Sequence, residues 1–131
     1  MYFPKIKKQI RVIIVLFAIL ILPVFLINAT KTMAEDGSNY RTVRAEHILV
    51  KTEDEAWAIK SKIDEGENFE ALAKKYSICP SKEKGGDLGY FTRGQMVPEF
   101  ENAAFSTPIG DVSDPVKTRF GWHLIKIIRK M

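Results

Sequence analysis

The sequence predicts an α+β domain in which a mostly antiparallel sheet is partly covered by helices. Three observations predict it. A β-rich segment at 43–51 partly alternates in polarity, and two segments with apolar residues at helical spacing follow before residue 80. Further short strand-like segments, with one helix between them, complete the chain. Strands grouped on either side of helices, instead of alternating with them one by one, indicate this fold class.

The first expected strand is Val43–Lys51, VRAEHILVK. Side chains of a strand point alternately to its two faces. The alternation therefore places one set of residues on one face and a second set on the other: Ala45, His47 and Leu49 against Glu46, Ile48 and Val50.

Two helices are expected next. Thr52-Glu53-Asp54-Glu55 has the S/T-x-x-E form of a capping box, and apolar residues continue at helical spacing until Gly66. Asn68 is a suitable N-cap for a second helix that ends before Pro80. The apolar stripe of this second helix comprises Phe69, Leu72, Ala73 and Tyr76.

The C-terminal part is expected to contain three short strands and one helix. A glycine-rich stretch, 85–89, leads to a strand at Tyr90-Phe91, and Pro98 suits the first turn of a helix that buries Phe100. Strands at 115–118 and 122–130 follow a turn at 108–110. Alternation in the last strand places His123, Ile125 and Ile127 on one face.

Residues 1–29 have the pattern of an export segment. Val12–Ile27 is a run of 16 residues without charge, and Lys5, Lys7, Lys8 and Arg11 precede it. This length lies between the roughly 7–15 residues of a signal-peptide core and the about 20 of a spanning helix. We expect an N-terminal hydrophobic helix that is an uncleaved anchor or a cleaved signal peptide; a buried core helix is the remaining alternative.

The rest of the chain is expected to comprise a polar linker at 30–42 and a domain at 43–131. Because the positive charges precede the apolar run, the domain is expected outside the cytoplasm, at a periplasmic or extracellular face, or secreted after cleavage. Residues 43–131 contain 14 Lys and Arg and 14 Asp and Glu residues, with the signs interleaved. A nucleic-acid-binding domain needs a clustered basic face, so no nucleic-acid partner is expected.

Three motifs resemble one known family. Arg44–Val50 resembles the opening strand of the parvulins, and 85–91 with 93–100, GGDLGYF and RGQMVPEF, resembles their central signature. Pro115-Val116 with Thr118, Phe120, Gly121 and His123 completes the pattern. Order and spacing match over almost all of residues 44–129.

The resemblance implies a parvulin-like four-stranded, mostly antiparallel sheet surrounded by about four helices. It also implies isomerisation of Xaa-Pro bonds without metal or cofactor. The expected substrates are exported or unfolded polypeptides, and the chain is expected to be a monomer. By position, the resemblance assigns His47 and His123 to a central histidine pair, Thr118 to its hydrogen-bond partner and Cys79 to a polar position beside the reacting peptide. Leu88, Met96 and Phe100 match the proline pocket, with Phe120 at its rim.

Two departures from relatives bear on this interpretation. Many parvulins have Asp at the position of Cys79, so a thiol is not essential for the reaction. Phosphate-directed relatives have a long basic loop after the first strand, whereas residues 51–55, KTEDE, are short and acidic. No requirement for a phosphorylated residue before proline is therefore expected.

Alternative functions follow from the same residues. A lone strand histidine is usually structural, and Met96 and Phe100, at i and i+4, are also what a helix core would contain. The two histidines lack a third ligand for zinc, Ile78-Cys79-Pro80 lacks a thiol-hydrolase signature, and the glycine-rich run lacks the ending of a phosphate loop. A non-catalytic polypeptide-binding chaperone module and a membrane-tethered adaptor are the rival functions.

Overall fold

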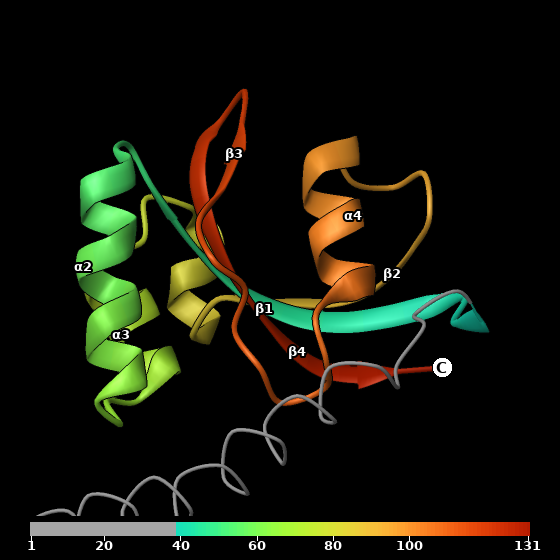
Figure 1. Cartoon of the computed structure of the whole chain (residues 1–131), viewed down its shortest axis with the longest axis horizontal. Helices are drawn as coiled ribbons and strands as arrows, with labels where there is room; N and C mark the ends of the chain where they lie inside the picture. The colour runs from blue at the N-terminus through green and yellow to red at the C-terminus, as the bar shows by residue number, and fades with distance from the viewer. Residues whose placement is uncertain (1–38) are drawn as a thin grey trace, which may run out of the picture. The chain divides into compact units, whose positions relative to one another are not determined.

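A four-stranded antiparallel sheet organises residues 39–131, the part of the chain that this computed structural model describes (Figure 1). Its strand order is β2-β1-β4-β3, so the first and last strands of the domain lie side by side at the centre. The strands are β1 (Thr42–Val50), β2 (Asp87–Thr92), β3 (Val116–Thr118) and β4 (Gly121–Lys130).

Three α-helices and one 3₁₀-helix accompany the sheet in the described residues: α2 (Glu53–Asp64), α3 (Phe69–Tyr76), η3 (Pro80–Lys84) and α4 (Pro98–Ser106). Both predicted caps are present. Thr52 and Glu55 form a reciprocal capping box at α2, and the side chain of Asn68 accepts a hydrogen bond from the backbone N–H of Ala71 at α3. Pro98 starts α4. Proline has no N–H, and it is tolerated there because the N–H groups of the first turn have no partner within the helix.

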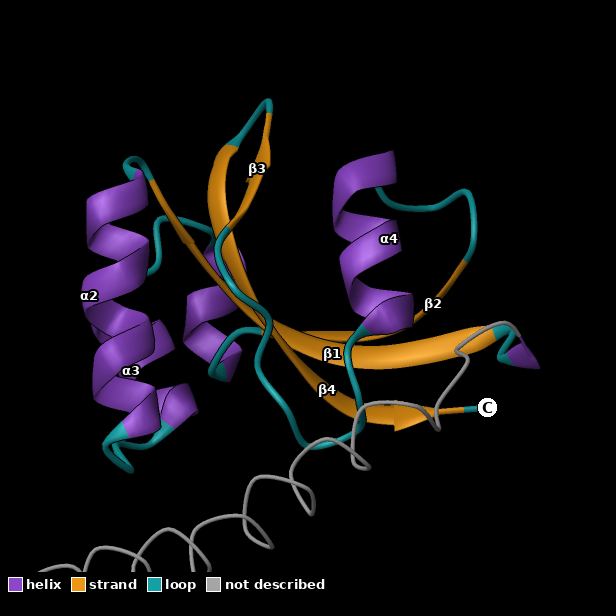
Figure 2. Ribbon diagram, in the orientation of Figure 1, coloured by secondary structure: helices purple, strands orange, loops and turns teal. Residues whose placement is uncertain are grey.

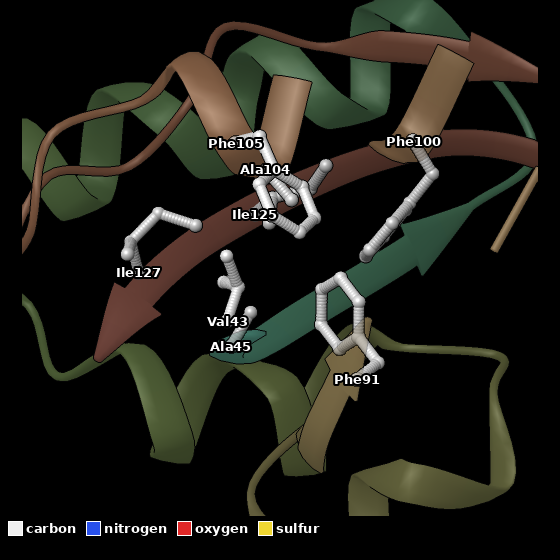
Figure 3. Packing of buried hydrophobic residues seen from close by; sticks show 8 residues of the cluster. All are labelled: Val43, Ala45, Phe91, Phe100, Ala104, Phe105, Ile125 and Ile127. Carbon is white, nitrogen blue, oxygen red and sulfur yellow. The ribbon is translucent and has the colours of Figure 1, made fainter. Parts of the chain in front are cut away.

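The two faces of the sheet have separate apolar cores, as the alternation in the strands predicts. α2 and α3 cover one face (Figure 2). Ile48, Val50 and Leu124 are buried in the core there. α4 covers the other face. The core there comprises the residues labelled in Figure 3, which come from β1, β2, α4 and β4: Val43, Ala45, Phe91, Phe100, Ala104, Phe105, Ile125 and Ile127.

The structure corrects two details of the predicted elements and confirms a third. β2 begins at Asp87, three residues before the expected Tyr90, because Asp87 pairs with Glu46 of β1 and its carboxylate binds Arg44 at 2.8 Å. α3 ends at Tyr76, before Pro80, as predicted. The segment that follows contains the unpredicted 3₁₀-helix, so "about four helices" corresponds to three α-helices and this short turn in residues 39–131.

The predicted N-terminal hydrophobic helix lies outside the described residues. Within residues 39–131, no helix has the length and apolar character needed to cross a membrane.

Candidate active site

His47 and His123 meet at the centre of the sheet because of the register between β1 and β4. His47 is opposite Ile125 and His123 is opposite Leu49, so the two histidines are diagonal neighbours on one face. Their Nδ1 atoms are 3.1 Å apart and their rings stack with centroids 5.3 Å apart. Both side chains are buried, with 5% and 4% of their surface exposed.

A hydrogen-bonded chain extends from this pair in both directions. Thr118 Oγ1 lies 2.7 Å from His123 Nε2 and also accepts the backbone N–H of Phe120. At the other end, His47 Nε2 lies 3.0 Å from Ser81 Oγ. The chain thus runs Ser81–His47–His123–Thr118, and every ring nitrogen in it has a partner.

Burial keeps both imidazoles neutral at neutral pH. Desolvation, with a further contribution from the charge of His123, lowers the pKa of His47 from 6.5 to about 4. Desolvation alone lowers the pKa of His123 to about 4. A neutral imidazole has one N–H donor and one acceptor, so each ring can link its two neighbours in the chain.

A cavity of about 520 Å³ opens beside the histidine pair, and its wall is mostly apolar. Phe100 connects the cavity to the core: its ring packs edge-on against His47 and His123, with centroids 5.7 and 5.2 Å away. Seven of the eight predicted site residues line this cavity: His47, Cys79, Leu88, Met96, Phe100, Phe120 and His123. The eighth, Thr118, is buried and contacts His123.

Cys79 reaches the cavity because the segment after α3 runs beside the end of β1. The backbone N–H of Ile78 donates to Leu49 O at 2.8 Å, and the backbone N–H of Leu49 donates to the hydroxyl of Ser77. Ser77 is buried and also accepts the N–H of Cys79. The thiol is free and partly exposed.

Two glycines permit close backbone approaches that hold the site together. A Cβ on Gly86 would lie 2.4 Å from His47 O, and one on Gly121 would lie 2.4 Å from Val50 O. Their φ angles are +88° and +137°, values that residues with a side chain rarely adopt. The Gly86 carbonyl in turn accepts the backbone N–H of His47 at 2.9 Å, so the turn that follows η3 is fixed to β1 at His47.

Several residues at the site were not identified from the sequence. Ser81 has the strongest role among them, and only its position two residues after Cys79 could have indicated it. The others are neighbours of predicted residues along the chain and complete the wall of the cavity: Leu49, Ile78, Pro80, Gln95, Val97 and Arg119.

The chain is similar to known isomerases and foldases. Residues 32–129 match the Rotamase family, described as the PPIC-type PPIase domain. Foldase protein PrsA of Geobacillus kaustophilus is 52% identical over 102 residues, which are 76% of this chain and 36% of that protein. The chain therefore spans about a third of the length of that relative.

Solved structures agree with the sequence match. The peptidylprolyl isomerase PrsA of Bacillus anthracis has a TM-score of 0.69 at 48% identity, covering 78% of this chain and 48% of that one. Pin of the psychrophilic archeon Cenarcheaum symbiosum has a TM-score of 0.63 at 45% identity, covering 73% of this chain and all of that one. The chain belongs to the PPIC-type peptidyl-prolyl cis/trans isomerase family, the parvulins.

Proposed function

We propose that this chain, a peptidyl-prolyl cis/trans isomerase by family, acts on unphosphorylated Xaa-Pro bonds of polypeptides that fold outside the cytoplasm. One observation carries the proposal: an apolar cavity of about 520 Å³ adjoins a buried, neutral, hydrogen-bonded histidine pair. This arrangement suits a reaction that breaks no covalent bond.

The barrier to rotation about an Xaa-Pro bond comes from amide resonance and is about 18–20 kcal/mol. Resonance separates charge between the amide oxygen and nitrogen, and the twisted amide has less of this separation. Transfer from water to an apolar cavity therefore disfavours the planar ground state more than the twisted state. Leu88, Met96 and Phe100 would hold the pyrrolidine ring while the carbonyl side turns.

The histidines would orient and polarise the site without transferring a proton. Their lowered pKa values leave both rings neutral. Both nitrogens of each ring already have hydrogen-bond partners in the series of side chains that begins at Ser81 and ends at Thr118. Thr118 would position His123. Cys79 would provide a polar edge beside the peptide, and the exposed ring of Phe120 would extend the apolar rim.

The setting of the reaction is also a proposal. A relative named a foldase supports a role in the folding of exported polypeptides. The uncharged run at 12–27 supports attachment to a membrane, with the domain on the outer face or secreted after cleavage. The short acidic segment 51–55 supports action without a phosphate requirement. We propose that the chain acts as a monomer, and the mechanism requires no cofactor.

The test is the cis-to-trans rate of tetrapeptides with Ala, Leu, Glu or phosphoserine before proline, measured with the full chain in detergent micelles. We expect acceleration of the unphosphorylated peptides and a large loss in Met96→Ala, which removes a cavity wall. Ile109→Ala is the matched control, since Ile109 is a half-exposed apolar residue outside the cavity wall.

The outcomes separate the candidate functions. If the folded protein binds the peptides but accelerates none, the polypeptide-binding module becomes the better account. If only the phosphoserine peptide is accelerated, the substrate class proposed above is wrong.

A further inference from the structure

Arg119 is the one residue with a fixed charge in the wall of the cavity beside the histidine pair, within residues 39–131. The other lining residues are apolar or neutral, and the two histidines are uncharged at neutral pH because burial lowers their pKa values to about 4. No acidic residue lines the cavity. Arg119 is therefore the residue of the cavity wall that can give the site an electrostatic preference.

The guanidinium of Arg119 is placed at the cavity rim by its neighbour. It lies over the ring of Phe120, 4.8 Å from the centroid, a separation at which the ring quadrupole attracts a cation. The pair sits in the tight turn 118–121 between β3 and β4, the same turn in which Phe120 N–H donates to Thr118. The rim cation is thus held against a side chain that itself lines the cavity.

This charge has no anionic partner within the described domain. Arg44 pairs with Asp87 at 2.8 Å and Arg93 with Glu101 at 3.8 Å, but among residues 39–131 no carboxylate lies within 4.0 Å of the Arg119 side chain. An incoming carboxylate would therefore not have to displace an existing salt bridge.

The domain as a whole has no net formal charge. Residues 43–131 contain equal numbers of basic and acidic side chains, so the domain has no net formal charge to attract anionic peptides from a distance. A charge preference, if measured, would be a local property of the rim.

We propose that Arg119 selects polypeptides with an acidic side chain next to the isomerising proline. The inference rests on the proposed isomerase function and adds a substrate preference to it. Asp or Glu in the residue beside the proline would place a carboxylate at the rim, where it pairs with the guanidinium. Phe120, against which the guanidinium packs, limits the freedom that this pairing would remove.

The expected preference is modest because the pair is exposed to solvent. Exposed ion pairs of this kind correspond to a preference of about 1.5- to 5-fold. High salt screens such pairs, so the preference should decline towards 1 at about 1 M salt, where the screening length is about 3 Å.

The experiment compares kcat/KM for peptides with Glu, Gln or Lys immediately before proline, and for a second series with the same residues immediately after it. The full chain is assayed in detergent micelles at low and high salt. We expect Glu to exceed Gln, and Gln to exceed Lys, in at least one series. Arg119→Gln should bring the Glu-to-Gln ratio to about 1, and Arg119→Glu should favour Lys.

The matched control is Lys117→Gln, which removes the same charge two residues away, at a side chain that packs over Trp122 and does not line the cavity. It should keep the Glu-to-Gln ratio of the unmodified chain. The ratio is internal to each variant, so a change in the folded fraction cancels from it.

Two negative outcomes are distinguishable. If the peptides are accelerated but the ratios stay near 1 in both series, or survive Arg119→Gln, the inference is overturned while the isomerase function stands. If no peptide is accelerated, the proposed function fails. The affinities of the Glu and Gln peptides, measured by calorimetry, then decide the inference in the same way.

Discussion

The Nδ1 atoms of His47 and His123 face each other at 3.1 Å inside the sheet. Only one of two facing nitrogens can carry the hydrogen of a hydrogen bond, so one ring donates and the other accepts. If both rings became imidazolium cations, two N–H groups and two positive charges would oppose each other. The geometry and the burial therefore favour the same protonation state, a neutral pair.

We expect the free energy of unfolding to fall as the pH decreases from 6.5 to 4. Unfolded histidines titrate near 6.5, whereas the pKa values of His47 and His123 are about 4 in the folded protein. Between these values the unfolded chain binds more protons, so acid favours unfolding, by a few kcal/mol in total for the pair. About one pH unit above 6.5, where the unfolded histidines are also neutral, the pair contributes almost no pH dependence.

Urea denaturation at pH 7.5, 6.0 and 4.5 measures this loss, and NMR titration of the two imidazoles measures the pKa values directly. Carboxylates also titrate near the lower limit, so the variant His47→Asn/His123→Asn provides the comparison and should lose less stability. Imidazole midpoints near 6.5 in the folded protein would contradict the prediction.

We expect Thr118→Val to destabilise the protein by about 1–3 kcal/mol and to lower activity. Thr118 Oγ1 accepts the N–H of Phe120, and we expect its own hydrogen to be donated to His123 Nε2, 2.7 Å away. This arrangement predicts that His123 carries its hydrogen on Nδ1. Valine has nearly the same shape but would leave the buried His123 Nε2 and the part-buried N–H of Phe120 without this partner.

Nitrogen-15 NMR shifts of His123 report the tautomer, and Thr118→Ser is the control because it keeps the hydroxyl. If the valine variant retained the tautomer and full activity, Thr118 would be only a packing residue.

At the other end of the hydrogen-bonded series, next to His47, Ser81→Ala should have a smaller effect on stability than Thr118→Val. The loss should be less than about 1 kcal/mol. Ser81 is partly exposed, so water can replace its hydroxyl as the partner of His47 Nε2. Activity should decline by a few-fold because a mobile water orients the imidazole less firmly. Comparing the urea midpoints of Ser81→Ala and Thr118→Val checks the order, and a larger loss of stability at Ser81 would refute it.

The local signals in the sequence predicted much of the fold. The capping box at Thr52, the Asn68 cap and Pro98 each depend on neighbours within one turn, and each is confirmed. Alternation in the first and last strands also predicted which side chains share a face, including His47 with Ala45. These features depend on backbone hydrogen bonds and pleating that a short window of sequence specifies.

Features that depend on long-range contacts were not predictable in the same way. β2 was expected to begin at Tyr90, but its start depends on the pairing of Asp87 with β1, far along the chain. Ser81 and Arg119 became visible as site residues only when η3 and the β3–β4 turn were placed beside the cavity. The assignment of His47 and His123 to one pair came from family resemblance, since alternation alone does not set the register between strands.

Gly86→Ala should be among the most damaging single substitutions in the domain, with a loss of about 3 kcal/mol or more. A methyl group at residue 86 would lie 2.4 Å from His47 O and 3.2 Å from His47 N, and the φ angle of +88° adds strain. The contact atoms belong to the backbone of a central strand, so they cannot move aside without shifting His47.

Gly89→Ala is the matched control. Its φ is +68°, but nothing lies within 4 Å of the position of an added Cβ, so this variant should lose only the about 1–2 kcal/mol of backbone strain. Urea denaturation gives the two stabilities, and peptide isomerisation, measured where both variants are folded, shows whether the shift reaches the site. Because Gly86 O also holds the N–H of His47, Gly86→Ala should reduce kcat/KM even in its folded fraction, whereas Gly89→Ala should reduce it less. Equal losses in the two variants would mean that backbone strain, and not the close approach of residue 86 to β1, explains the glycine at this position.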